Sequence, residues 1–172
     1  ITHQLYGGDN ENRLRQELLL GVGGLRALKA MNIEPDLFHL NEGHAAFLGL
    51  ERLRNFMKEK GLSYPEALET VRASQLFTTH TPVPAGHDTF PESLLKEYLF
   101  EYTYALDISW EDLIGLGRIQ RDNAMELFNV SHLAIRTSQE INGVSKLHGE
   151  VSQRMFSELN PDYNHTESPI GY

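Results

Sequence analysis

Apolar residues recur at three- and four-residue steps in several segments of the chain, and shorter apolar runs separate these segments. Such steps place the apolar residues on one face of an α-helix. The first segment begins at about Glu11, where Asp9 or Asn10 can cap the helix. Its apolar face consists of Leu14, Leu18, Val22, Leu25 and Leu28.

Six further helices are predicted from helix start signals and from apolar faces. Three have a start signal: a capping box with proline at 63–66 for a helix to about Ala73, the same signal at 89–92 for a helix to about Tyr102, and 109–112 for a short helix. Three have an apolar face: Ala46, Leu50, Leu53 and Met57, ended by Gly61; Leu127, Phe128, Val130, Leu133 and Ala134, after Asp122; and Leu147, Val151 and Met155.

Short apolar runs between these helices predict β-strands at 5–6, 37–40, 76–79 and 141–145. Alternation of strands and helices is typical of a mainly parallel sheet with helices on its faces. The predicted fold class is therefore α/β. In sheets of this kind, ligands bind beyond the carboxyl ends of the strands.

Polar residues follow three of the predicted strands, of which the first has the weakest sequence signal. They are Asp9 and Asn10 after the first, Asn41, Glu42 and His44 after the second, and His80 after the third. Because the carboxyl ends of neighbouring parallel strands meet at one edge, we expect these side chains to share a cleft. A cleft with many hydrogen-bond donors and acceptors suits a hydroxylated ligand such as a sugar. Prolines at 82, 84 and 91 would stiffen the loop after His80.

Each of these candidates also has a purely structural interpretation. A single histidine after a strand is more often a hydrogen-bonded structural residue, and Glu42 could complement the dipole of its own helix. His80, His87 and Asp88 have the side chains of metal ligands, but their spacing matches no defined metal motif. No metal site is therefore predicted.

The composition narrows the class of protein. The chain has 172 residues, of which 40% are hydrophobic and 23% are charged, as is usual for one globular domain. Its net charge of −9 disfavours nucleic acid or an anionic membrane as the main partner. It has no cysteine, no apolar run long enough for a membrane span and no signal-peptide pattern, so a cytoplasmic location is predicted. Its sequence also lacks the serine-hydrolase, P-loop and dinucleotide-binding motifs.

The two ends of the chain indicate a longer parent protein. The chain starts at Ile1 rather than at a methionine, and its last residues, SPIGY, are typical of the start of a strand. We therefore expect a piece of a longer polypeptide.

Four blocks of the sequence together carry a specific family resemblance. They are LYGGDNENRLRQE (5–17), HLNEGHAAF (39–47), FTTHTPVPAGHDTFP (77–91) and NGVSKLHGEVS (142–152). These blocks resemble the α-glucan phosphorylases, the family of the glycogen, starch and maltodextrin phosphorylases. Their residues are most similar to those of the bacterial and archaeal branch of this family. They occur in the family's order, and the resemblance covers nearly the whole chain.

The resemblance implies an enzyme that uses inorganic phosphate to cleave the terminal α-1,4-linked glucose of a glucan or maltooligosaccharide, giving glucose 1-phosphate with retention. It implies a glycosyltransferase fold of two Rossmann-like domains with the active site between them. Residues 1–172 would be part of the N-terminal Rossmann-like domain, and the C-terminal cofactor domain would be absent. Pyridoxal phosphate would then be held by a lysine outside this chain. The full-length enzyme would be a homodimer, and we expect the isolated chain to be inactive.

The resemblance also implies roles for individual residues. His80 matches a histidine that contacts the glucosyl unit, and Asp9 and Asn10 match an acidic–amide pair on a loop that gates the site. Glu42 and His44 match residues that line the sugar cleft. No nucleophile or general acid is assigned, because that work falls to the cofactor. Two alternatives stay open: a glycogen- or starch-synthase-like transferase that uses a nucleotide sugar, and a sugar-binding module without catalytic activity.

Overall fold

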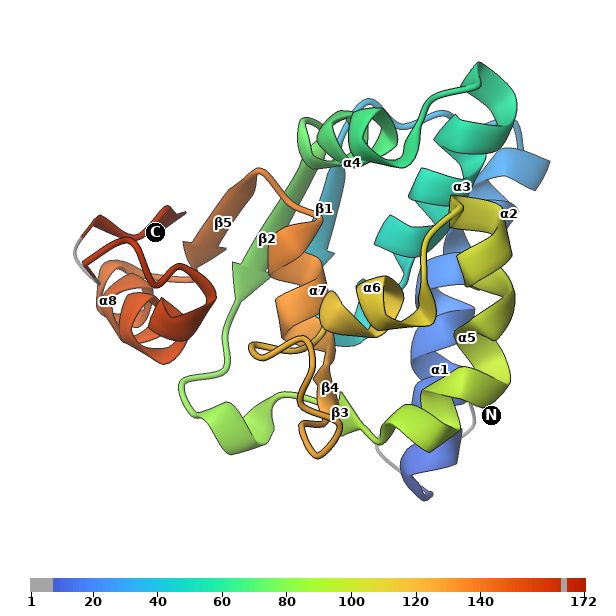
Figure 1. The fold of residues 1–172 in the computed structure, drawn as a ribbon. Coiled ribbons are helices and arrows are strands. Elements are labelled where there is room, and N and C mark those ends of the chain that lie inside the picture. The colour runs from blue at the N-terminus through green and yellow to red at the C-terminus, as the bar shows by residue number, and fades with distance from the viewer. Residues whose placement is uncertain (1–7, 165–166) are drawn as a thin grey trace.

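A sheet of parallel strands forms the centre of the fold (Figure 1). The computed structural model describes residues 8–164 and 167–172. Among these residues four strands pair in the order β1 (Phe38–Asn41), β2 (Gln75–Thr79), β5 (Glu140–Gly143) and β6 (Ile170–Gly171), and each neighbouring pair is parallel. This confirms the predicted α/β class with a mainly parallel sheet. The strand predicted at 5–6 lies outside the described residues.

One row of apolar side chains crosses this sheet. Leu40 lies opposite Phe77, Phe77 opposite Ile141, and Ile141 opposite Ile170. All four side chains are buried. The row fixes the register of the strands, because a shift by one residue would turn a strand's side chains to the other face.

Helices pack against the sheet and extend beyond its β1 edge. They are α1 (Asn10–Leu18), the π-helix η1 (Leu19–Gly23), α2 (Gly24–Ala30), α3 (Leu48–Lys60), α4 (Tyr64–Arg72), α5 (Glu92–Leu106), α6 (Trp110–Gly115), α7 (Val130–Arg136) and α8 (Lys146–Met155). Short 3-10 turns lie at η2 (Gly43–Ala45), η3 (Pro84–Gly86) and η4 (Ser157–Leu159). In Figure 1, α8 lies beside β5, and α1, α2, α3 and α5 lie beyond β1. None of the helices in the described ranges is long and apolar enough to cross a bilayer.

Several helix boundaries follow from local signals that the sequence contains. The capping box forms at Ser63, whose backbone N–H donates to Glu66 at 2.9 Å. Gly61 ends α3 in the left-handed conformation with φ of 66°, which glycine adopts readily. The side chain of Ser109 accepts the backbone N–H of Asp112 at 2.9 Å and so caps α6. The helix boundaries predicted from these three signals are confirmed.

The helix predicted after Asp122 is wrong over most of its first half. Residues 121–127 form turns, and Phe128–Asn129 form β4, which pairs antiparallel with β3 (Thr89–Phe90). Phe128 is buried, whereas Leu127 is half exposed. Leu127 is therefore not part of the buried apolar face that the sequence predicts here. The helix α7 begins only at Val130. Its N-cap is Asn129, whose side chain accepts the backbone N–H of Ser131 at 2.8 Å.

Two smaller corrections concern α5 and α8. The start signal at 89–92 does not cap α5, because Thr89–Phe90 pair with β4 and the helix begins at Glu92 after Pro91. Leu147 was expected on the apolar face of α8, but its side chain is 72% exposed. Apolar spacing alone therefore does not fix which residues of α8 face the core.

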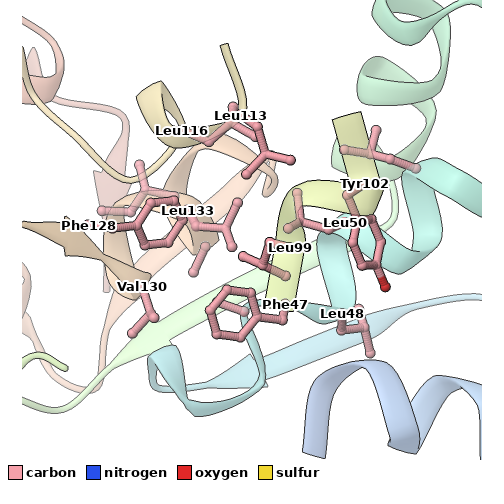
Figure 2. Packing of buried hydrophobic residues seen from close by; sticks show 14 of the residues in the cluster. Phe47, Leu48, Leu50, Leu99, Tyr102, Leu113, Leu116, Phe128, Val130 and Leu133 are labelled. Atoms are coloured by element: carbon pink, nitrogen blue, oxygen red, sulfur yellow. The ribbon is translucent and has the colours of Figure 1, made fainter. Parts of the chain in front are cut away.

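The main buried cluster joins α3, α5, α6 and α7 (Figure 2). The rings of Phe47 and Phe128 stack with their centroids 6.2 Å apart. Leu50, Leu99 and Leu133 are fully buried in the same cluster. Burial of a side chain of this size contributes about 1.5–3 kcal/mol to stability, so the cluster holds these helices together beside the carboxyl ends of β1 and β2.

Candidate functional site

The carboxyl ends of β1 and β2 lie side by side and bring predicted site residues together. Asn41 is paired with Thr78, and the backbone N–H of Glu42 donates to the carbonyl of Thr78 at 2.9 Å. The Nε2 atom of His80 lies 2.8 Å from the side-chain oxygen of Asn41. Both His80 and Asn41 are exposed. This edge of the sheet therefore presents an imidazole and an amide to solvent as one hydrogen-bonded pair.

Glu42 joins the two strand ends. Its carboxylate accepts the backbone N–H of His80 and, at 3.1 Å, the hydroxyl of Thr81. Its backbone has φ of 66° and ψ of 177°, a conformation that residues other than glycine seldom adopt and that costs on the order of 1–3 kcal/mol. The two hydrogen bonds offset part of this cost and direct the carboxylate toward the loop after β2.

The turn η2, which carries His44, is tightly packed from two sides. A Cβ atom on Gly43 would lie 2.7 Å from a methyl group of Val130 in α7. A Cβ atom on Gly21 of the π-helix would lie 2.7 Å from the backbone nitrogen of Leu48. Only glycine fits at such distances without a shift of the neighbouring atoms, so α7 and the π-helix fix the position of η2.

His44 connects η2 to helix α1 and to the loop before β3. Its Nδ1 atom lies 2.7 Å from a guanidinium nitrogen of Arg13 and 3.4 Å from the carboxylate of Asp88. The same guanidinium nitrogen donates to Asp88 at 2.6 Å. Burial alone would raise the pKa of Asp88, but its contacts with His44 and Arg13 hold that pKa well below its usual range. Asp88 is therefore ionised and pairs with Arg13.

Asp9 and Asn10 lie at the start of α1 and are exposed. The Oδ1 atom of Asp9 accepts the backbone N–H of Asn12 at 2.9 Å, which confirms its predicted role as the N-cap. In the described part of the chain, Arg13 provides the hydrogen bonds that tie α1 to His44 and Asp88. A role of Asp9 and Asn10 at the sugar cleft stays a prediction.

Arg13 and Glu17 were not among the predicted site residues. They and Gly21 follow one another at four-residue steps, so they lie on one face of α1 and the π-helix, and this face meets η2. Two charged residues in line with a glycine are the signal that could have identified this face. Burial, together with the hydrogen bond and charge of Asp88, raises the pKa of Glu17 to about 9.

Three other histidines lie in the interior rather than at the strand ends. His87, His132 and His148 are each less than 10% exposed. The Nδ1 atom of His87 lies 2.8 Å from the hydroxyl of Ser131, and its ring meets Phe156 edge-on. Burial lowers the pKa of His87 and lowers that of His132 to about 4. These two neutral imidazoles pack inside the domain and do not contribute to the exposed edge.

The parallel sheet and its exposed polar carboxyl edge define an α/β domain that presents hydrogen-bonding side chains at the ends of neighbouring strands. A sequence model of one family, described as carbohydrate phosphorylase, matches residues 25–166. The chain belongs to the carbohydrate phosphorylase family. This confirms the resemblance that the four sequence blocks carry.

Individual relatives show how much of the chain is similar and how much longer they are. The glycogen phosphorylase of Mycobacterium tuberculosis is 43% identical over 99% of this chain and 21% of its own length. The maltodextrin phosphorylase of Thermococcus litoralis is 43% identical over 92% of this chain and 18% of its own length. The glycogen phosphorylase of Aquifex aeolicus is 36% identical over 100% of this chain and 24% of its own length. The chain thus spans no more than a quarter of the length of these three relatives.

Proposed function

We propose that this chain forms part of the sugar-binding cleft of an α-glucan phosphorylase. The whole enzyme is then a cytoplasmic glycosyltransferase that cleaves the terminal α-1,4-linked glucose of a glucan with inorganic phosphate and releases glucose 1-phosphate. Residues 1–172 are assigned to its N-terminal Rossmann-like domain. The family match and the names of the relatives support the reaction. The convergence of His80, Asn41 and Glu42 at one edge is the observation that supports the site.

The geometry suits recognition of sugar hydroxyl groups. The imidazole of His80 and the amide of Asn41 are exposed and can exchange hydrogen bonds with a ligand. His44 supplies a second imidazole in η2, three residues after Asn41 along the chain. The carboxylate of Glu42 already accepts two hydrogen bonds from the loop after β2. We therefore assign Glu42 to holding this loop in place, and the two histidines to contacting the sugar.

Pyridoxal phosphate, which the family resemblance implies, does not fit the residues of this chain. A lysine that forms a Schiff base is usually buried, because burial lowers the pKa of its amine. All five lysines of the chain are exposed: Lys29, Lys58, Lys60, Lys96 and Lys146. The cofactor's lysine is therefore assigned to another part of the enzyme, and no step of the reaction is assigned here to a residue acting with the cofactor.

The family match favours this proposal over a synthase-like transferase that uses a nucleotide sugar. A sugar-binding module without catalysis differs from it in a measurable way. The longer protein that contains this chain should release glucose 1-phosphate from a maltooligosaccharide and phosphate, and the isolated chain should not. Binding of the maltooligosaccharide without any phosphorolysis by the longer protein would favour the module.

The site is tested by His80→Ala in the longer protein. We expect kcat/KM for phosphorolysis to fall by about 100-fold or more, as on loss of one well-placed hydrogen-bonding group. The control is His39→Ala, which removes an exposed imidazole of β1 that lies 2.8 Å from the hydroxyl of Thr78 and bonds to this group rather than to His80 or Glu42. Equal activity of the two variants would contradict the assignment of His80.

A further inference from the structure

The carboxyl group of Glu17 is buried inside the domain. Its side chain is 1% exposed. Within the described ranges, neither of its oxygens accepts a hydrogen bond. The Nε atom of Arg13 lies 3.3 Å from one of its oxygens. An ionised carboxylate in such a position would lack most of the hydrogen bonds that it makes in water, which costs several kcal/mol.

The carboxyl group of Glu17 faces a second carboxyl group. Oxygens of Glu17 and Asp88 and a ring nitrogen of His44 lie within 4.8 Å of one another. Asp88 is the ionised member, because Arg13 donates to it at 2.6 Å. Two neighbouring carboxyl groups that cannot both ionise share one proton, and the proton stays on the one with the poorer donors. That group is Glu17.

We propose that Glu17 is a protonated carboxylic acid that donates its hydrogen bond to Asp88, and that this proton keeps Arg13 bonded to Asp88 and His44, so that His44 stays correctly oriented at the sugar-binding edge. Glu17 is thus a positioning residue that acts through Asp88, Arg13 and His44. The part of the inference that concerns the sugar rests on the proposed function. The part that concerns the proton rests on the contacts of Glu17 alone.

The charge balance around His44 gives the reason. One guanidinium, Arg13, faces one ionised carboxylate, Asp88, when Glu17 is protonated. Arginine only donates, so the Nδ1 atom of His44 accepts from Arg13. The proton of the neutral imidazole is then on Nε2, where it can be donated to a sugar hydroxyl. Ionisation of Glu17 would add a second negative charge beside the Nε atom of Arg13 and would draw the guanidinium away from His44.

The directions of the two pKa shifts agree with a shared proton. Burial and the neighbouring Asp88 raise the pKa of Glu17, whereas the pKa of Asp88 is lowered by His44, Arg13 and Glu17. Arg13 on α1, His44 on η2 and Asp88 before β3 are the charged and titratable groups that face Glu17 from these three elements. A proton bound by Glu17 should therefore be lost only at alkaline pH.

A bound cation is the competing explanation of the cluster. Glutamate, histidine and aspartate are all metal ligands, and their atoms here lie close together. The guanidinium of Arg13 is, however, already bonded to both Asp88 and His44 and supplies the positive charge between them. A metal ion would have to displace it.

Infrared spectroscopy of the protein at pH 7 tests the proton directly. We expect the C=O stretching band of a protonated carboxyl group, lost in Glu17→Gln and retained in the matched control Glu51→Gln. Glu51 is also fully buried, but Arg26, Arg54 and Tyr102 donate to its carboxylate, and these hydrogen bonds outweigh burial and lower its pKa to about 2. Absence of the band from wild type would overturn the inference, and so would tight binding of Zn²⁺ or Mn²⁺ that Glu17→Gln abolishes.

Sugar affinity of the longer protein tests the positioning role. Glutamine is neutral and keeps a donor, so Glu17→Gln should bind a maltooligosaccharide within about twofold of wild type at pH 7. Glu17→Leu lacks the donor, and its affinity should fall by about tenfold. Wild type should lose affinity above about pH 9, where Glu17 ionises, and Glu17→Gln should not.

The two measurements separate the two proposals. Failure of wild type to bind sugar, with the infrared band present, would refute the proposed function but not the proton on Glu17. A tenfold loss of affinity in folded Glu17→Gln at pH 7 would show that a negative charge is needed at this position, and would overturn the inference. Identical pH profiles of wild type and Glu17→Gln would also overturn it.

Discussion

The imidazole of His80 and the side-chain amide of Asn41 lie 2.8 Å apart at the ends of two neighbouring parallel strands. Their contact depends on register, because Asn41 is paired with Thr78 and the loop after β2 begins two residues later. A shift of one residue would turn Asn41 to the opposite face of the sheet. The buried row of Leu40, Phe77 and Ile141 that fixes the register therefore also fixes this pair of ligand-type side chains.

Glu42 combines an unfavourable backbone with two favourable hydrogen bonds, and two substitutions separate these effects. Glu42→Ala loses both hydrogen bonds and keeps the strained φ of 66°, so we expect the free energy of unfolding to fall by about 1–3 kcal/mol. Glu42→Gly loses the same hydrogen bonds but relieves the strain, so it should be about 1 kcal/mol or more stable than Glu42→Ala. Urea unfolding of both variants measures the difference. Equal stability of the two would show that the backbone at this position is not strained.

Two glycines in one helical segment should respond to alanine in opposite ways. A Cβ atom at Gly21 would lie 2.7 Å from the backbone of Leu48 and 3.0 Å from the backbone of Ala45, so Gly21→Ala should destabilise the chain by about 1–3 kcal/mol. Gly24 has open space around its Cβ position and an ordinary helical backbone. Gly24→Ala should therefore stabilise the chain by up to about 1 kcal/mol.

The midpoints of thermal unfolding report both changes, with Gly24→Ala as the control for helix propensity. A neutral Gly21→Ala would mean that the π-helix can move away from η2 at little cost. In that case the close contact at Gly21 would not be what positions His44.

Stability should fall as the pH falls below about 6.5, because His132 is buried and neutral. Burial lowers its pKa to about 4 in the folded chain, whereas the unfolded chain binds a proton near the ordinary value of 6.5. Unfolding therefore takes up a proton between these two values, and His132 alone should remove on the order of 3 kcal/mol of stability by pH 4. Urea unfolding at several pH values measures this loss.

His132→Gln should lose less stability than wild type over the same pH range. The dependence should not vanish, because burial also lowers the pKa of His87, which acts in the same direction. His39→Gln is the control, since this imidazole is exposed. If His132→Gln and His39→Gln had the same pH dependence as wild type, neutral burial of His132 would not be the cause.

The sequence predicts the parts of the fold that depend on local signals. The capping box at Ser63, the C-terminal Gly61 and the N-cap Asp9 act within one helical turn, and all three form as expected. The helix predicted after Asp122 is wrong in its first half, although its apolar residues have helical spacing. Phe128 is instead drawn into a strand pair with Phe90, a partner distant in the sequence. Local periodicity contains no information about such a partner.

The candidate site is predictable from the sequence only where its residues directly follow strands. The rule that ligands bind at the carboxyl ends of parallel strands correctly placed His80 beside Glu42, because both directly follow strands that pair. Glu17 could not be recognised in this way. It lies in the last turn of α1, and its significance comes from the proximity of Asp88 and His44, which belong to other segments of the chain.

The parallel order of the strands also has a consequence for how the chain folds. No hairpin joins neighbours of the four-stranded sheet: the chain between β1 and β2 contains α3 and α4, and the chain between β2 and β5 contains α5 to α7. Contacts between such distant segments form late, because a long loop must close before any of them is gained. We expect refolding on a timescale of milliseconds to seconds rather than microseconds, with unpaired strand edges exposed to self-association until the last crossover has closed.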